Sequence, residues 1–216
     1  FTDLYYNIGG AQGSIDLQPE WSDNFETGIR SALEINEKLS LSFEQALFIR
    51  QGHNLIDWVR FSGEDTTRAT NLREVTFTGT ETSLKLKSVN GNYIKANYTS
   101  MKASESSSGF ESNYVLDFLK HQLNLRALLA LPREINLTFR YSLQDREGGY
   151  YNPVDEIEEE FVPLQLFGVS ISKNYMNGKL NTNLTVDNVL DIEVHDIGNV
   201  MLPGRMIKVG LNFAVD

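Results

Sequence analysis

"EINLTFRYSLQ", residues 134–144, decides the fold class, because apolar and polar side chains alternate strictly from its second residue onward. The apolar positions are Ile135, Leu137, Phe139, Tyr141 and Leu143. The polar positions between them are Asn136, Thr138, Arg140, Ser142 and Gln144. A period of two is typical of a β-strand, whose successive side chains point to opposite faces of the sheet. The stretch therefore predicts a strand with an apolar face that includes Phe139 and a polar face that includes Thr138.

The same alternation recurs along the whole chain and predicts about nine strands. We expect them at about residues 24–34, 39–51, 72–87, 91–104, 114–131, 134–146, 161–173, 179–187 and 205–215. The stretch "SALEINEKLS" (31–40) has some helical character, but its flanks alternate, so we expect a hairpin turn at about 35–38.

The third of these segments changes phase in its middle. Its apolar residues stand at odd positions in Val75 and Phe77 but at even positions in Leu84 and Leu86. One extra residue in a strand would produce such a shift. We therefore expect a β-bulge near Gly79.

Connections between the predicted strands alternate between short and long. The turns at "INEK", "SVNGN", "LPRE" and "NYMNGK" are short. The connections at about 52–71, 105–113, 147–160 and 188–204 are long and polar. Hairpins with short turns at one end and long loops at the other are typical of bacterial outer-membrane barrels. A soluble sandwich mixes its loop lengths and uses Greek-key crossings instead.

The polar face carries charges that a dry protein core would not tolerate. Its charged residues include Glu44, Arg50, Lys95, Arg126 and Arg140. Burying them between two packed sheets would be costly, whereas a water-filled lumen accommodates them. The sequence therefore predicts an all-β fold, an antiparallel meander of about nine strands that forms part of a large transmembrane β-barrel. Because bacterial barrels have an even number of strands, we expect open outer edges at 24–34 and 205–215.

Composition excludes several other classes of protein. The 216 residues carry 29 acidic and 19 basic side chains, a formal net charge of −10, which argues against binding to nucleic acid. The chain has no cysteine and three scattered histidines, at 53, 121 and 195, without metal-ligand spacing or a nucleophile elbow. We therefore expect no enzyme activity, no metal site and no cofactor. Since the chain opens on Phe1 without a signal peptide, we also expect a segment to precede it.

Three motifs, in this order, carry a resemblance to a known family. They are "LQPEWSDNFETGIR" (17–30), "NLIDWV" (54–59) and "NVLDIEVHDIGNVMLPGRMIKVGLNF" (188–213). Together they resemble the TonB-dependent outer-membrane receptors, and the sequences of the motifs are most similar to cobalamin-type and siderophore-type receptors of Bacteroidetes-like bacteria. The chain ends "NFAVD", so Phe213 only approximates the terminal aromatic residue of that family.

The resemblance implies an outer-membrane transporter that imports a scarce, large solute such as cobalamin or an iron–siderophore complex. Its partners would be outer-membrane lipid, TonB acting through a plug domain and, as a further candidate, a surface lipoprotein. Neither a plug nor a TonB box is found in this sequence. We therefore assign all of residues 1–216 to the C-terminal portion of the barrel.

The resemblance also implies that ligand recognition lies on the extracellular loops. The candidates are His53, Asp57, Trp58, Tyr150, Tyr151, Asp155, Glu156, His195 and Asp196. Three of them, Trp58, Tyr150 and Tyr151, fit an aromatic interface belt as well. The acidic run 155–160 fits a solvated charged surface better than a calcium site, because its spacing matches no known calcium loop. For Arg205 we favour an ion pair, with a neighbouring strand or the acidic loop before it, over a ligand contact.

The alternative from another class is a small, non-transporting outer-membrane or surface β-protein with a structural or adhesion role. The segment that precedes Phe1 distinguishes the two hypotheses. A plug and TonB box would favour transport, and a signal peptide directly before Phe1 would favour the alternative.

Overall fold

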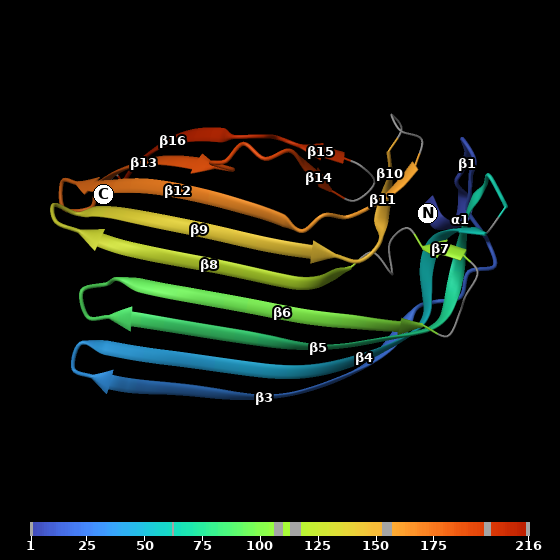
Figure 1. Ribbon diagram of the computed structural model, residues 1–216, viewed down its shortest axis with the longest axis horizontal. Helices are drawn as coiled ribbons and strands as arrows, with labels where there is room; N and C mark the ends of the chain where they lie inside the picture. The colour runs from blue at the N-terminus through green and yellow to red at the C-terminus, as the bar shows by residue number, and fades with distance from the viewer. Residues whose placement is uncertain are drawn as a thin grey trace.

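The structure, a computed structural model, describes residues 2–61, 63–105, 110–112, 118–152, 157–196 and 200–214. Nine long strands form one antiparallel sheet in which each pairs with the next along the chain (Figure 1). They are β3 (Trp21–Asn36), β4 (Leu39–Phe61), β5 (Thr67–Ser88), β6 (Tyr93–Glu105), β8 (Leu119–Leu131), β9 (Ile135–Arg146), β12 (Leu164–Tyr175), β13 (Leu180–Asp187) and β16 (Met206–Phe213). This meander confirms the predicted fold class.

Short elements complete the described residues. They are α1 (Thr2–Tyr5), β1 (Asn7–Ile8), β2 (Ala11–Gln12), β7 (Phe110–Ser112), β10 (Gly149–Asn152), β11 (Ile157–Glu160), β14 (Val194–Asp196) and β15 (Val200–Leu202). Strand β2 adds to β5 in parallel, and β7 adds to the far end of β4. Among the described residues, no helix combines the length and apolar character needed to cross a membrane.

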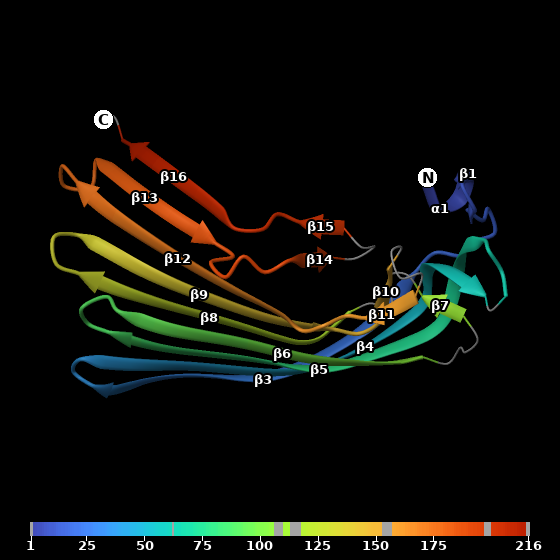
Figure 2. The same cartoon turned by 45° about the horizontal axis from the view of Figure 1, so that its top comes forward.

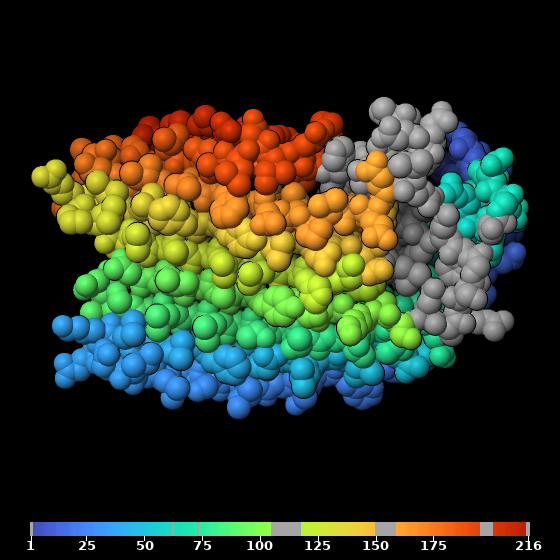
Figure 3. Space-filling model, in the orientation of Figure 1, coloured from blue at the N-terminus to red at the C-terminus, as the bar shows by residue number. Residues whose placement is uncertain are grey.

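The two outer strands of the sheet are open, as predicted. In the described part of the chain, β3 pairs only with β4 and β16 pairs only with β13. Figure 2 shows that the sheet curves across its width instead of lying flat. In the space-filling view the strands lie side by side without a break from β3 to β16 (Figure 3). A curved sheet with two open edges is the geometry of a barrel wall.

Strand register divides the sheet into an apolar and a polar face. Directly paired residues of antiparallel strands point to the same side. One apolar row crosses five strands through Leu129, Leu137, Ile171, Leu184 and Val209. All but Leu137 belong to the exposed large hydrophobic residues, with 40% to 82% of their surface accessible. Since no second layer covers this face in the described structure, it suits contact with lipid.

The adjacent row on the other face is polar. Asn136 pairs with Ser172, Ser172 with Asn183, and Asn183 with Gly210. On β9 itself Phe139 is 42% exposed and Thr138 is only 6% exposed, so they lie in different environments as the alternation predicts. Along β9 the two faces of the sheet therefore follow the sequence period.

Short and long connections lie at opposite ends of the sheet (Figure 1). The turn between β3 and β4 falls at Asn36–Leu39, as predicted, and the turn between β12 and β13 contains Gly178 at φ 87°. The β10–β11 and β14–β15 hairpins and the tip of the β4–β5 hairpin all lie at the other end. This separation confirms the predicted alternation of loops along the chain.

Two details of the prediction were wrong. The predicted loop 52–71 is mostly strand, because β4 and β5 stay paired up to Arg60 and Thr67. No bulge occurs near Gly79, which pairs directly with Phe48 in an unbroken register, and a side chain at Gly79 would overlap the Phe48 ring. The sequence of a long strand pair resembles that of a loop when its apolar and polar residues do not alternate in a single phase.

The phase change in β5 reflects a change in which face is buried. Val75 is fully buried and packs with Leu55, Val59 and Leu72, while Phe77 packs against this cluster. This small core lies where the β4–β5 hairpin extends beyond the neighbouring strands and bends, next to the left-handed Asn54 (φ 55°). Apolar residues therefore change face because the hairpin folds onto itself and the N-terminal segment.

We expect arginine to distinguish the two faces in β12. Ile171→Arg should cost about 2–4 kcal/mol of folding free energy in bilayers, because it places a cation on the lipid face near mid-membrane. Ser172→Arg adds the same side chain to the water-facing side and should cost much less. Urea titrations of the full-length protein refolded into lipid vesicles measure both values. Equal costs would contradict the assignment of the faces.

Candidate functional site

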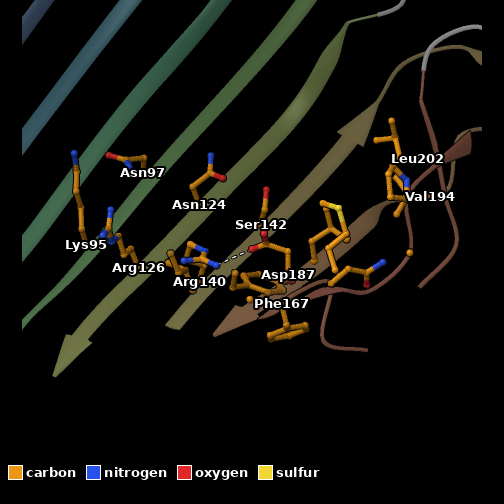
Figure 4. A pocket seen from close by; sticks show the side chains of 18 residues that line it. Lys95, Asn97, Asn124, Arg126, Arg140, Ser142, Phe167, Asp187, Val194 and Leu202 are labelled. Atoms are coloured by element: carbon orange, nitrogen blue, oxygen red, sulfur yellow. Dashed lines mark hydrogen bonds and ion pairs between the residues drawn. The ribbon is translucent and has the colours of Figure 1, made fainter. Parts of the chain in front are cut away.

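A groove of about 620 Å³ lies on the polar face of the sheet, beneath the loop between β13 and β16 (Figure 4). Its floor comes from the strands and includes Lys95, Asn97, Asn124, Arg126, Arg140, Ser142 and Asp187. Its roof comes from the loop and includes Asn188, Val194, Leu202, Pro203 and Gly204. A ligand in this groove would therefore meet charged and amide groups together with Leu166 on the strands, and mostly apolar groups on the loop.

One ion-pair network joins three strands at the edge of the groove. Asp187 Oδ1 accepts a hydrogen bond from Arg140 Nη2 at 2.7 Å, and Asp187 Oδ2 accepts one from Lys208 Nζ at 2.9 Å. Arg140 reaches Asp187 across β12, where a Cβ on Gly168 would stand 3.0 Å from the same guanidinium. All three side chains are at least one-third exposed, so each pair contributes only about 0.2–1 kcal/mol. The network orients Arg140 toward β13.

Asn188 holds the start of the roof. It is only 7% exposed and has a left-handed backbone, with φ 49°. Its side-chain Nδ2 donates to the Ile192 carbonyl at 2.7 Å, and its Oδ1 accepts from the Ile192 amide at 3.0 Å. These two bonds close a tight turn directly after β13.

Asp191 joins the start of the loop to its end. Its Oδ1 accepts a hydrogen bond from the Arg205 amide at 2.7 Å, and its carboxylate lies 3.9 Å from the Arg205 guanidinium. This confirms the preferred reading of Arg205 as an ion pair with the preceding acidic loop. Between these ends β14 pairs with β15, and Val194 is 3% exposed. The long polar excursion between the last two strands is thus a folded roof.

Predicted ligand contacts on β4 have intramolecular partners in this structure. The His53 ring stacks on Trp21 with 3.8 Å between centroids, and its Nδ1 lies 3.6 Å from the Glu74 carboxylate. Asp57 is fully buried, and its Oδ1 accepts a hydrogen bond from the Trp58 amide. Trp58 Nε1 donates to the Asp3 carboxylate at 2.8 Å. The role of these residues in ligand binding stays a prediction.

The remaining predicted contacts that the structure describes lie at the long-loop end. Tyr150 and Tyr151 are on β10, paired with residues of β11, while His195 and Asp196 are on β14, paired with residues of β15. Asp155 and Glu156 lie outside the described residues. Elsewhere in the described chain, no group of three or more His, Asp or Glu side chains is arranged to hold a metal ion. The described candidates on β10 and β14 therefore share one end of the sheet, and their binding role stays a prediction.

The floor of the groove was not among the binding residues predicted from the sequence. Lys95, Arg126 and Arg140 were predicted to face a wet lumen but not to share a position. The signal is the strand register, which aligns these three residues directly across neighbouring strands. The short turns in the sequence could have supplied this register, because each turn fixes the pairing of its hairpin.

A model of the outer membrane protein beta-barrel family matches residues 7–197. The chain belongs to this family. Membership places the protein in the outer membrane, and it agrees with a curved sheet whose apolar face is uncovered. A search of curated proteins finds no match.

Solved structures share the fold of this barrel wall. A mutant of the ferric enterobactin receptor PfeA from Pseudomonas aeruginosa, in complex with enterobactin, aligns with TM-score 0.63 and 16% identity over 93% of this chain. A second mutant of that receptor aligns with TM-score 0.62 and 18% identity over 93%. The FrpB iron transporter from Neisseria meningitidis aligns with TM-score 0.60 and 13% identity over 94%. The chain spans 32% of the length of each of these proteins.

We expect Asn188→Ala to loosen the roof without disturbing the barrel wall. The substitution removes both side-chain hydrogen bonds to Ile192, and it leaves alanine in a left-handed conformation that costs about 1–2 kcal/mol. Amide hydrogen exchange should accelerate at Ile192 and Arg205.

The matched control is Asn177→Ala, at another left-handed asparagine (φ 56°), in the short turn at the opposite end. It should leave exchange in the roof unchanged. Unaltered exchange at Ile192 in Asn188→Ala would contradict the proposed role of Asn188.

Proposed function

We propose that this chain forms part of the wall of an outer-membrane active transporter that imports a scarce, large solute, of the iron–siderophore or cobalamin type. The observation that carries this proposal is the groove beneath the loop between β13 and β16, on the polar face of a sheet whose other face is apolar. A purely structural wall does not require a charged groove on its polar face.

The geometry supports different roles for the apolar and the polar face of the sheet. Exposed apolar residues such as Ile171 and Val209 would contact outer-membrane lipid, while the polar face would line a water-filled passage. Loops at one end of the sheet would capture the solute at the cell surface, and they would also offer a docking site for a surface lipoprotein. The groove lies on the face that would line the passage, beneath one of these loops, so it can hold a solute on its way inward.

Similarity to solved receptors supports the class of cargo. The aligned proteins are described as a ferric enterobactin receptor and an iron transporter, and an iron complex is therefore our first candidate. Cobalamin stays a second candidate, on the resemblance of the sequence motifs. Since the chain spans about a third of the aligned receptors, we propose that it supplies the C-terminal portion of a larger barrel. Energy would come from TonB acting through a plug domain outside residues 1–216.

A growth experiment tests transport against the structural or adhesion alternative. The gene is deleted, and the bacterium is supplied with cobalamin, or with siderophore-bound iron, as the sole source of that nutrient. We expect growth to fail on one of these sources and to return when the intact gene is restored. Normal growth of the deletion strain on every source would contradict the transport proposal.

We expect the 188–204 loop to be required for uptake but not for assembly. Replacing it with a short glycine-containing turn removes the roof of the groove and should abolish uptake, while the protein still reaches the outer membrane. The control replaces the turn at 176–179, at the opposite end of the sheet, with Asn-Gly, and should transport normally. Radiolabelled solute uptake and outer-membrane fractionation measure the two effects. Normal uptake without the loop would show that it is only a spacer.

A further inference from the structure

A row of four basic residues crosses the polar face at a single level. Lys85 on β5 pairs with Lys95 on β6, Lys95 pairs with Arg126 on β8, and Arg126 pairs with Arg140 on β9. Residues paired in this way have Cβ atoms only about 4.5–5.5 Å apart. We call these four residues the basic row. It stands in a chain whose formal net charge is −10, so the local concentration of positive charge opposes the overall balance.

The centre of the basic row has no anionic partner in the described structure. Arg140 is paired with Asp187 at 2.7 Å, and Lys85 lies over the Tyr93 ring at 5.2 Å from its centroid. Lys95 and Arg126 make no ion pair with any described residue. Like charges placed directly opposite each other destabilise a sheet, so an anion bound between them would relieve the repulsion.

Lys95 and Arg126 also face a cavity instead of open solvent alone. Both line the groove together with Arg140, and the only carboxylate among its lining residues is Asp187. Three positive charges against one negative charge leave the groove net positive. Figure 4 shows Lys95 and Arg126 close together on the floor, next to Asn97 and Asn124, whose amides can donate hydrogen bonds.

The roof adds a second chemical requirement. Opposite the basic floor, the roof presents Val194, Leu202 and Pro203. A small inorganic anion would leave these apolar groups without contact. A solute with several negative charges and an apolar or aromatic body would satisfy floor and roof together.

We propose that Lys95 and Arg126 form an anion-binding subsite that selects multiply charged anionic solutes with an apolar body over neutral solutes of similar size. The inference rests on the proposed transport function, and it assigns the selectivity to the wall of the barrel beneath the loops. Charge-assisted hydrogen bonds from the guanidinium and ammonium groups hold the anion. Binding should therefore weaken as ionic strength rises.

Two iron complexes of similar size test this selectivity. In an iron(III) tris-catecholate, three dianionic catecholates outweigh the metal charge and leave a trianion. In an iron(III) tris-hydroxamate, three monoanionic hydroxamates balance the metal charge and leave a neutral complex. Binding to the full-length receptor in detergent is followed by quenching of tryptophan fluorescence. We expect the native receptor to bind the trianion at least about tenfold more tightly than the neutral complex.

The variant Lys95→Gln/Arg126→Gln removes both charges at the centre of the row. It should weaken binding of the trianion by about tenfold or more and flatten its salt dependence, with little effect on the neutral complex. The matched control Lys38→Gln/Lys179→Gln removes two positive charges from the short turns at the opposite end of the sheet, and neither residue lines the groove. It should bind the trianion like the native receptor.

Several outcomes would overturn the inference. They are equal affinity of the native receptor for both complexes, no binding of the trianion, and unchanged trianion binding in the groove variant. The groove variant could also bind the trianion normally but melt at a lower temperature without ligand. That result would show that the basic row stabilises the protein through contacts with acidic protein groups instead of binding solute. Failure of the subsite differs from failure of transport, because a receptor that supports growth on a neutral complex alone remains a transporter without this selectivity.

Discussion

Backbone hydrogen bonding in lipid is the constraint on which the rest of this structure depends. A membrane interior offers no water to unpaired N–H and C=O groups, so a spanning sheet must pair every strand with a neighbour. The nine long strands meet this demand through continuous antiparallel ladders, of which the one between β4 and β5 extends from Leu39 to Arg60. Once these ladders form, successive side chains must alternate between lipid and lumen. The apolar and polar faces are consequences of this pairing.

The same register assembles the groove from residues that are far apart in sequence. Lys95 and Arg140 are separated by 45 positions but only by β8 in the sheet, because each hairpin turn brings the next strand back to the same level. Because Gly168 has no side chain, the Arg140 side chain can cross β12. Its guanidinium then donates a hydrogen bond to Asp187, which lies directly before the loop. A loop closed by its own side chains at Asn188 and Asp191 can cover this floor without a second layer of secondary structure.

Most of the fold could be predicted from the sequence, because alternation and turn residues are local signals. Stretch 134–144 is an example, since each of its residues has the environment that its position indicates. The β4–β5 hairpin could not be predicted in full, because Val75 is buried in a cluster with Leu55 that only the folded hairpin creates. Trp58 is another example, since its partner Asp3 lies 55 positions away. Non-local packing of this kind leaves no period in the sequence.

Residue-by-residue access to lipid and water shows whether this sheet is a membrane wall with a wet inner face. The chain has no cysteine, so single cysteines can be introduced along β12 from 166 to 173 in the full-length protein and spin-labelled in bilayers. For a membrane wall, we expect collision with lipid-soluble oxygen to peak at odd positions, such as 169 and 171. Collision with a water-soluble nickel chelate should peak at even positions, such as 170 and 172. Equal access of both reagents at all positions, or the opposite phase, would show that the two faces do not separate lipid from water.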